Sequence, residues 1–396
     1  MFEYKNKNSK RCDVNNQGKN ILKYRFIQSD QELSQVCDQL AQEPIIGVDL
    51  EADSMHCFQE KICLIQIATE SEAFLVDPFI ISDFSAFSAI LENPDIIKIF
   101  HGSDFDVRSI DRELHVRIRN LFDSEIACRF LNEKERGLAA LLKNNFDVHV
   151  DKKFQKVDWS KRPLKEDMIE YSVEDVAHLV KLYRILMERL EGIGRAHWAK
   201  EEFTAQSKVK YENNHTLPLF KKFKGAGRMD NRSLAVLESL LHVRLKMAEK
   251  KDLPLFKIMS NQSILTMANN RPKSPGEMVG MKALSKRQAG MYGKYCQEAI
   301  EGALALPHKD LPSYPKSHMP RKTPAVQERI NRLKAMRERM SEEVGMEPGF
   351  LINNALIMAI AFANPVDRVA LSNIAPIRNW QMECLADEIL KTLGRK

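Results

Sequence analysis

Three closely spaced apolar runs near the start of the chain limit the fold more than any other feature of the sequence. They cover residues 45–50, 62–67 and 73–76, and each has the length and composition of a buried strand. Because the gaps between them are short, we expect neighbouring strands that form a meander. A further strand pattern at 24–27 and an amphipathic helix pattern at 30–40 precede them.

The rest of the first half continues the alternation of strands and helices. We expect a helix near residues 84–91 and a buried strand over 96–100, followed by a mainly helical pattern from 104 to about 190. The predicted fold of this half is therefore an α/β domain with a mixed sheet.

The second half shows only helical patterns, and these patterns repeat. A charged helix pattern leads into Leu253-Pro254-Leu255-Phe256, and 94 residues later another leads into Glu347-Pro348-Gly349-Phe350. A second helix and a proline follow in each copy. We therefore predict two all-α repeats after the α/β domain.

These patterns give provisional domain boundaries. We expect a disordered polar lead at 1–20, the α/β domain at 21–205 and a basic linker at 206–227. The first helical repeat would follow at 228–306, a proline-rich linker at 307–324 and the second repeat at 325–396.

Charge is divided unevenly between the two halves. Residues 1–210 carry 30 Lys and Arg against 36 Asp and Glu, whereas residues 211–396 carry 30 against 18. An acidic half joined to a basic half suggests that the basic part holds a polyanion on which the acidic part acts, and nucleic acid is the leading polyanion. Seven cysteines without CxxC spacing, and no signal-like or membrane-spanning segment, favour the reducing cytoplasm.

Four acids and one tyrosine lie in or next to apolar segments, where burying a charged side chain is energetically unfavourable. Asp49 and Glu51 are two apart in an apolar strand and therefore share a face, while Tyr171 and Asp175 are four apart in a predicted helix and also share a face. Asp106 follows the buried strand at 96–100. Carboxylates in apolar surroundings are expensive unless a cation lies between them.

The simplest such cation is a pair of divalent metals. Hard oxygen ligands suit Mg²⁺ and Mn²⁺, which keep coordination positions for water and phosphate oxygens. Two such ions can activate a water on one side of a phosphodiester and stabilise the leaving 3′ oxygen on the other. We expect the Tyr171 hydroxyl to orient the attacking water.

Three motifs in order make the chain resemble the ribonuclease D family, members of the DEDD exonuclease superfamily with a tyrosine in the third motif. The motifs are Asp49-Leu50-Glu51, the six residues from His101 to Asp106, and Tyr171-Ser172-Val173-Glu174-Asp175. Supporting matches are residues 63–67, 122–127 and 158–164. The two helical repeats resemble HRDC domains, the nucleic-acid-binding modules that this family carries in tandem.

The resemblance implies a ribonuclease H-like sheet with flanking helices and a specific set of ligands. Asp49, Glu51 and Asp175 would bind the first metal. Asp49 would also bind the second, and Asp106 would reach it directly or through water. The reaction would be hydrolytic 3′-5′ removal of 5′-nucleotides from RNA with a free 3′ end, with transfer RNA precursors as suggested substrates. No obligate protein partner is evident.

Alternatives remain for several residues. The spacing of the second motif favours Asp106 over Asp104 as the ligand. His101 is a metal ligand, a structural residue or a contact for the terminal nucleotide. Trp159 and Arg162 either stack on and grip RNA, or fill the domain and pair with an acid. The basic residues Arg244, Lys246, Lys250 and Lys251 are candidates for a face that follows phosphates.

Two other functions use the same residues. The same acids occur in DNA 3′-5′ exonucleases of the proofreading or repair type, and a domain with a dead site would act as an RNA-binding scaffold. The filled catalytic positions argue against the scaffold, and the tandem helical repeats favour RNA over DNA.

Overall fold

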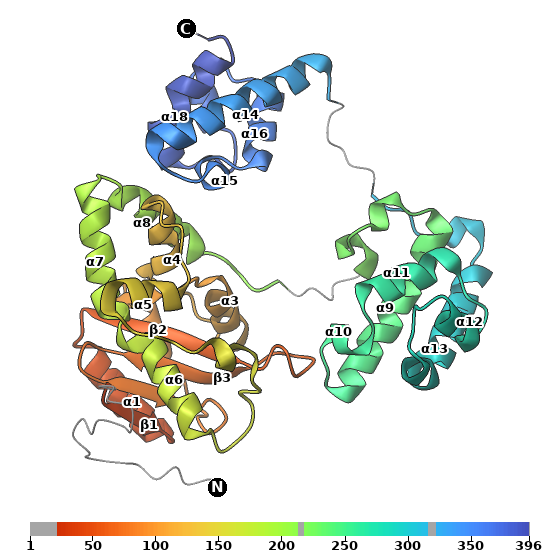
Figure 1. The fold of residues 1–396 in the computed structure, drawn as a ribbon, viewed down its shortest axis with the longest axis horizontal. Helices are drawn as coiled ribbons and strands as arrows, with labels where there is room; N and C mark the ends of the chain where they lie inside the picture. The colour runs from red at the N-terminus through yellow and green to blue at the C-terminus, as the bar shows by residue number, and fades with distance from the viewer. Residues whose placement is uncertain (1–21, 213–217, 316–321, 396) are drawn as a thin grey trace. The chain divides into compact units, whose positions relative to one another are not determined.

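The computed structural model describes residues 22–212, 218–315 and 322–395 (Figure 1). The predicted disordered lead at 1–20 lies outside the described residues. The chain forms two compact units. The first contains the sheet domain and the second helical repeat, and the other contains the first helical repeat with the short segment 52–61.

The sheet has six strands in the order β1-β4-β3-β2-β5-β6. They are β1 Tyr24–Ile27, β2 Ile45–Ala52, β3 Ile62–Ala68, β4 Ala73–Val76, β5 Ile97–Phe100 and β6 Leu121–Asp123. Strands β3 and β4 are antiparallel, whereas β1 pairs with β4, β2 with β5 and β5 with β6 in parallel. The predicted mixed sheet is confirmed.

Eight helices accompany the sheet in the described part of this domain, and Figure 1 shows α6 lying across it. They are α1 Asp30–Leu40, α2 Ser85–Glu92, α3 Asp104–Glu113, α4 Ser124–Phe130, α5 Leu138–Phe146, α6 Glu166–Ala177, α7 Leu179–Gly192 and α8 Ala196–Gln206. Helix α6 contacts β3 and β4, α7 contacts β5, and α8 contacts β6. Strands β3 and β4 are buried along their whole length, so the core lies on both faces of the sheet.

Lys98 is an unusual member of this core. Its side chain is fully buried in the middle of β5, and its ammonium group donates hydrogen bonds to the carbonyls of Asn93 and Ile96. Burial lowers the pKa of Lys98 to about 8 because the interior disfavours the charged form. Lys98 therefore ties the turn before β5 to the strand.

The two helical repeats have matching element lengths, which confirms the internal repeat. The first has α9 Asn231–Lys251, α10 Leu255–Ile258, α11 Asn261–Asn270, α12 Pro275–Gly280 and α13 Lys286–Ala305. The second has α14 Pro324–Val344, α15 Pro348–Leu351, α16 Asn354–Ala363, α17 Arg368–Ser372 and α18 Asn379–Thr392. The first three helices have 21, 4 and 10 residues in each copy.

The second repeat shares one core with the sheet domain. Its Trp380 ring lies 5.2 Å from the ring of Phe130 and 5.9 Å from that of Trp198. The Glu201 carboxylate of α8 accepts hydrogen bonds from the backbone N–H groups of Asn379 and Trp380, at the start of α18. The second repeat thus packs against the sheet domain.

The structure differs from the sequence expectations in three places. The helical region contains β6, which is too short to give a periodic signal. The predicted helix that carries Tyr171 and Asp175 ends at Ala177, and His178 separates it from α7. The predicted linker 206–227 is partly folded, because Phe220 and Phe223 of its short 3₁₀ turns are buried in the core of the first repeat.

None of the helices in the described ranges has the length and apolar character needed to cross a membrane. The six cysteines in those ranges are all unpaired, which agrees with the absence of a disulfide framework.

Candidate active site

Three separate elements carry the five candidate catalytic residues. Asp49 and Glu51 lie on β2, Asp106 lies in the first turn of α3, and Tyr171 and Asp175 lie one turn apart on α6. Asp49, Glu51 and Asp175 each place one carboxylate oxygen so that the three atoms lie within 4.8 Å of one another. Asp106 is buried beside Asp49. The fold therefore brings together residues more than 120 positions apart.

All four carboxylates have raised pKa values. Burial raises the pKa of Asp49 to about 6. Burial, followed by repulsion from the neighbouring acids, also holds the pKa values of Glu51, Asp106 and Asp175 well above their ordinary range. The donor set consists of oxygens alone, and a divalent cation between these carboxylates would reverse the repulsion. The cluster therefore fits the divalent metals that exonucleases of the DEDD superfamily use.

A glycine allows this convergence. A Cβ atom on Gly47, two residues before Asp49, would lie 2.9 Å from Leu179 Cβ and 3.3 Å from the Val176 carbonyl oxygen. Only a glycine lets the α6–α7 junction approach β2 this closely. Val176 directly follows Asp175, so this contact sets the spacing between the carboxylates of the strand and the helix.

Tyr171 is held on both sides. Its hydroxyl donates a hydrogen bond to the Asp175 carboxylate, and its ring lies 5.1 Å from the Phe154 ring and 6.2 Å from the Trp159 ring. Burial, with the nearby negative charges of Asp175 and Glu51, raises the pKa of Tyr171 far above its usual value. The hydroxyl is therefore protonated at neutral pH.

The two acids of the second motif occupy different environments. Asp106 is buried and faces Asp49, whereas the side chain of Asp104 is 62% exposed and accepts hydrogen bonds from Arg108 one turn along α3. The Arg108 hydrogen bond lowers the pKa of Asp104. Asp106, the residue favoured by the motif spacing, is the one that joins the cluster.

His101 has a defined proton position. Its Nδ1 lies 2.9 Å from the Ser124 hydroxyl oxygen, and that hydroxyl donates its single proton to the Phe100 carbonyl. Nδ1 must therefore donate to Ser124, which leaves an unprotonated Nε2 on a neutral ring. Burial lowers the pKa of His101, which favours the same neutral form.

Trp159 and Arg162 lie inside the domain. Trp159 is 1% exposed and packs near Tyr171. Arg162 uses Nε and Nη2 on the buried carboxylate of Asp77, and its remaining donors on the carbonyls of Cys63, Trp159 and Lys161. These positions match the structural alternative for both residues, and an RNA contact by either one stays a prediction.

The proposed basic face on the first repeat loses one member. Arg244 is buried and donates to the Met259 carbonyl and the Asn261 side chain, and burial lowers its pKa to about 10. Its inclusion in that face was wrong, because the helical charge pattern does not distinguish a solvated arginine from one that crosses the core. Lys246, Lys250 and Lys251 are exposed.

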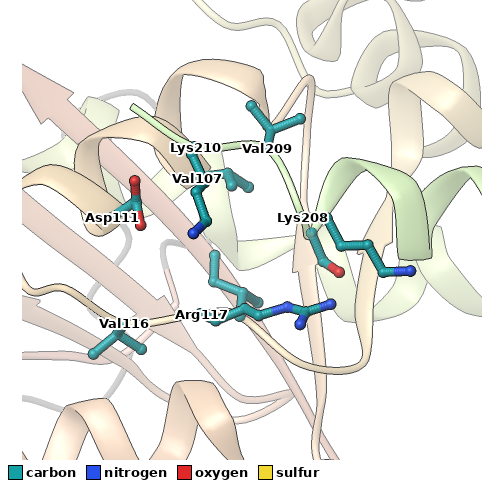
Figure 2. A pocket seen from close by; sticks show the side chains of 9 residues that line it. Val107, Asp111, Val116, Arg117, Lys208, Val209 and Lys210 are labelled. Atoms are coloured by element: carbon teal, nitrogen blue, oxygen red, sulfur yellow. The ribbon is translucent and has the colours of Figure 1, made fainter. Parts of the chain in front are cut away.

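A small cavity of about 130 Å³ lies apart from the acid cluster, and none of the five candidate catalytic residues lines it. Figure 2 shows Asp111, Arg117 and Lys210 entering it from three segments. Asp111 accepts a hydrogen bond from the Tyr211 backbone, and Arg108 donates to the Lys210 carbonyl. The cavity therefore marks where the end of the nuclease-like domain is fastened to α3.

Asp123 lies beside the candidate site, and no role was predicted for it from the sequence. It is buried and accepts hydrogen bonds from the backbone N–H groups of Gly102 and Ser103, at 3.0 and 2.7 Å, inside the second motif. The sequence feature that could have identified Asp123 is a helix N-cap pattern, because this aspartate directly precedes the helix that starts at Ser124. The corresponding feature for Gly47 is a glycine within a predicted strand, which indicates a close approach of another segment.

Comparison with protein families assigns each part of the chain. A family model described as 3′-5′ exonuclease matches residues 24–191, and one described as HRDC domain matches residues 233–300 and 326–393. The fold, the acid cluster and these matches define a 3′-5′ exonuclease domain followed by two HRDC domains.

Similar proteins extend the match over the whole chain. Ribonuclease D of Gluconacetobacter diazotrophicus is 26% identical over 372 residues, which cover 92% of this chain and 91% of that protein. Ribonuclease D of Haemophilus influenzae is 28% identical and covers 74% and 73%. The crystal structure of Escherichia coli RNase D superposes with a TM-score of 0.72 at 24% identity, covering 94% of this chain and 99% of that one. The chain is a ribonuclease D-like 3′-5′ exoribonuclease.

Proposed function

We propose that Asp49, Glu51, Asp106 and Asp175 hold two divalent ions, Mg²⁺ or Mn²⁺, and that the enzyme releases 5′-nucleotides one at a time from the 3′ ends of structured RNAs. The observation that carries this proposal is the convergence of four buried or half-buried carboxylates with raised pKa values. Such a cluster is unfavourable without a cation and well suited to one.

The ligands divide between the two ions by position. Asp49, Glu51 and Asp175 form the close group and would hold one ion, while Asp49 and Asp106 would hold the other. When bound, the ions supply Lewis acidity to the scissile phosphate and lower the pKa of the attacking water. The chain's part is to fix the carboxylates on β2, α3 and α6.

Tyr171 orients the attacking water. Because its raised pKa keeps the hydroxyl protonated and its proton is used on Asp175, the oxygen presents lone pairs that can accept a hydrogen bond from water. It therefore acts by position rather than as a general base.

His101 contacts a sugar hydroxyl at the 3′ end of the substrate. The strand register pairs Gly47 with Ile99, so His101 lies at the level of Asp49, one strand away. Its Nε2 carries a lone pair and bonds to no residue in the described part of the chain, so it can accept a hydrogen bond from a hydroxyl group. A ribose offers one more such hydroxyl than a deoxyribose, which favours RNA.

Transfer RNA precursors are the substrates we propose. The E. coli neighbour is an exoribonuclease involved in structured RNA processing, and in this chain two HRDC domains follow the exonuclease domain. The excess of basic residues after position 210 provides charge for a folded RNA.

Paired variants in one helical turn test the site. Asp106→Asn should lower kcat on a 3′-tailed RNA hairpin about 100-fold or more, because it removes a charged ligand. Asp104→Asn, a control on the exposed neighbour, should retain activity. Nearly equal rates for Asp106→Asn and the wild type would contradict the assignment.

Substrate controls test the direction and the sugar. The wild type should produce a divalent-metal-dependent ladder from the hairpin and none when the 3′ end is blocked. A matched DNA should be degraded more slowly, and His101→Ala should reduce this preference. Faster loss of the DNA would favour the DNA exonuclease alternative.

A further inference from the structure

We propose that the second HRDC domain holds Asp106 in place through helix α4 and is therefore part of the catalytic centre. The inference rests on the proposed function in treating Asp106 as a metal ligand. It concerns the described part of the second repeat, which shares one core with the sheet domain.

The N-terminal end of α4 is hydrogen-bonded to the second motif. Asp123, the N-cap residue of α4, receives hydrogen bonds from the N–H groups of Gly102 and Ser103 and from the Ser103 hydroxyl, the last at 2.7 Å. Its carboxylate also caps α4 itself through Glu125 and Ile126. One buried side chain thus joins the start of α4 to the loop before α3.

This loop determines where Asp106 lies. Ser103 is the N-cap residue of α3, and its carbonyl accepts the hydrogen bond from Val107 that closes the first helical turn. Gly102 has a φ of +69°, a left-handed conformation that suits glycine and turns the chain toward α3. A shift of the Gly102–Ser103 amides would therefore move Asp106.

The second end of α4 lies under the second HRDC domain. Phe130, the last residue of α4, has its ring 4.9 Å from that of Phe350 and 5.2 Å from that of Trp380, both edge-on. Arg195 donates hydrogen bonds to the carbonyls of Phe130 and Val344, so it joins α4 to the end of α14. The helix is buried at this end only while the domain is docked.

A second connection runs beside the first. Arg136 bonds to Glu125 in the first turn of α4 at 3.2 Å and to Glu347 of the second HRDC domain at 2.9 Å. Gly102, Asp123, Glu125 and Phe350 also line one hollow of about 410 Å³. The docked domain therefore contacts the second end of α4 directly and is connected to its first turn through Arg136.

A helix of seven residues is about 10 Å long, so little can bend between its ends. Undocking would expose Phe130 and remove Glu347, one of the two carboxylate partners of Arg136, and α4 could then tilt on its contacts with α7 and α8. Because Asp123 moves with α4, the tilt would loosen the loop that positions Asp106. Supporting residues of this kind commonly affect metal affinity or rate about 10- to 100-fold.

The internal repeat supplies a matched control. Phe256 lies in the short helix that follows the long first helix of the first HRDC domain, and Phe350 lies one helical position further along in the corresponding short helix of the second. Phe256 is 52% exposed, whereas Phe350 packs on Phe130. Either substitution removes a phenylalanine from the short helix of its repeat, and among the ring contacts of the described residues it is Phe350 that packs on Phe130 of α4.

The test compares Phe350→Ala with Phe256→Ala in the full-length chain. Hydrogen exchange of the metal-free protein should be about tenfold faster at Gly102 and Ser103 in Phe350→Ala, and unchanged there in Phe256→Ala. On a trinucleotide RNA, Phe350→Ala should raise the metal concentration for half-maximal rate about tenfold. Unchanged exchange at both amides would overturn the proposal.

A milder variant covers the case in which Phe350→Ala loses the fold of its domain. Glu347→Gln keeps the apolar packing and weakens only the Arg136 connection, so it should speed exchange at the same amides by a smaller factor. No change there would also overturn the proposal. Because exchange is measured without metal or substrate, faster exchange together with a fully active Asp106→Asn would contradict the role of Asp106 and leave the link intact.

Discussion

Substitution of Gly47 by alanine should lower the activity of the enzyme, although residue 47 is not one of the residues proposed to bind metal or substrate. The new Cβ would lie 2.9 Å from Leu179 Cβ, against an ordinary contact of 3.4–4 Å. The clash is with a Cβ atom rather than with the end of a flexible side chain, so the α6–α7 junction must move away from β2. The required movement is about 0.5–1 Å.

This movement acts directly on the acid cluster. Asp175 precedes Val176, whose carbonyl also lies against Gly47, while Asp49 and Glu51 stay on β2. A misplacement of about 1 Å can cost about 100-fold in rate, so we expect kcat to fall about 10- to 100-fold. Overpacking of this kind should also lower the free energy of unfolding by about 1–3 kcal/mol.

The assay is hydrolysis of a short 3′-labelled RNA at a series of Mg²⁺ concentrations, with thermal melts of the same samples. Gly192→Ala is the control, because a Cβ at the end of α7 meets nothing within 4 Å. That variant should keep its rate and melt at or slightly above the wild-type temperature. A Gly47→Ala enzyme with wild-type kcat and metal dependence would refute the argument that this contact sets the carboxylate spacing.

Further predictions concern Tyr171, Asp49 and Arg162. Tyr171→Phe should lower kcat about 10- to 100-fold with little change in half-saturating metal, because the residue positions water rather than metal; a matching loss of metal affinity would contradict this role. The pKa of folded Asp49, about 6, exceeds its ordinary value, so metal-free protein should lose stability as the pH rises from about 4 through 6. Melts in EDTA should show this fall in the wild type and a smaller one in Asp49→Asn; equal slopes would count against it. Arg162→Ala leaves the buried Asp77 unpaired, so urea unfolding should show a loss of about 3–5 kcal/mol, and a loss below 1 kcal/mol would contradict the ion pair's role.

Local patterns were enough to predict which faces most of the candidate catalytic residues share. The two-residue spacing of Asp49 and Glu51 and the four-residue spacing of Tyr171 and Asp175 depend only on the periods of a strand and a helix. The structure puts each pair on one face, on β2 and α6. The choice between Asp106 and Asp104 needed the motif spacing of the family, because both acids lie in the first turn of α3.

Features that depend on contacts between distant segments could not be predicted in this way. The hydrogen bonds of Asp123 join residues about 20 positions apart, and the packing of Phe350 on Phe130 joins residues 220 apart. Arg244 shows the same limit in the opposite direction, since its charge predicted exposure and its long stem carries it through the core to the Met259 carbonyl. These placements follow from which surfaces the folded elements bury.

The buried amine of Lys98 is shielded from acylating reagents while the sheet is intact. Acylating reagents attack neutral amines, and a pKa of about 8 would make this lysine more reactive than an ordinary one if it were reachable. Because the side chain is fully buried between β2 and β6, modification requires β5 to open. The rate of labelling at Lys98 would therefore report how often β5, the strand that leads to His101 and Asp106, opens locally. Exposed lysines such as Lys246 would react without any such opening.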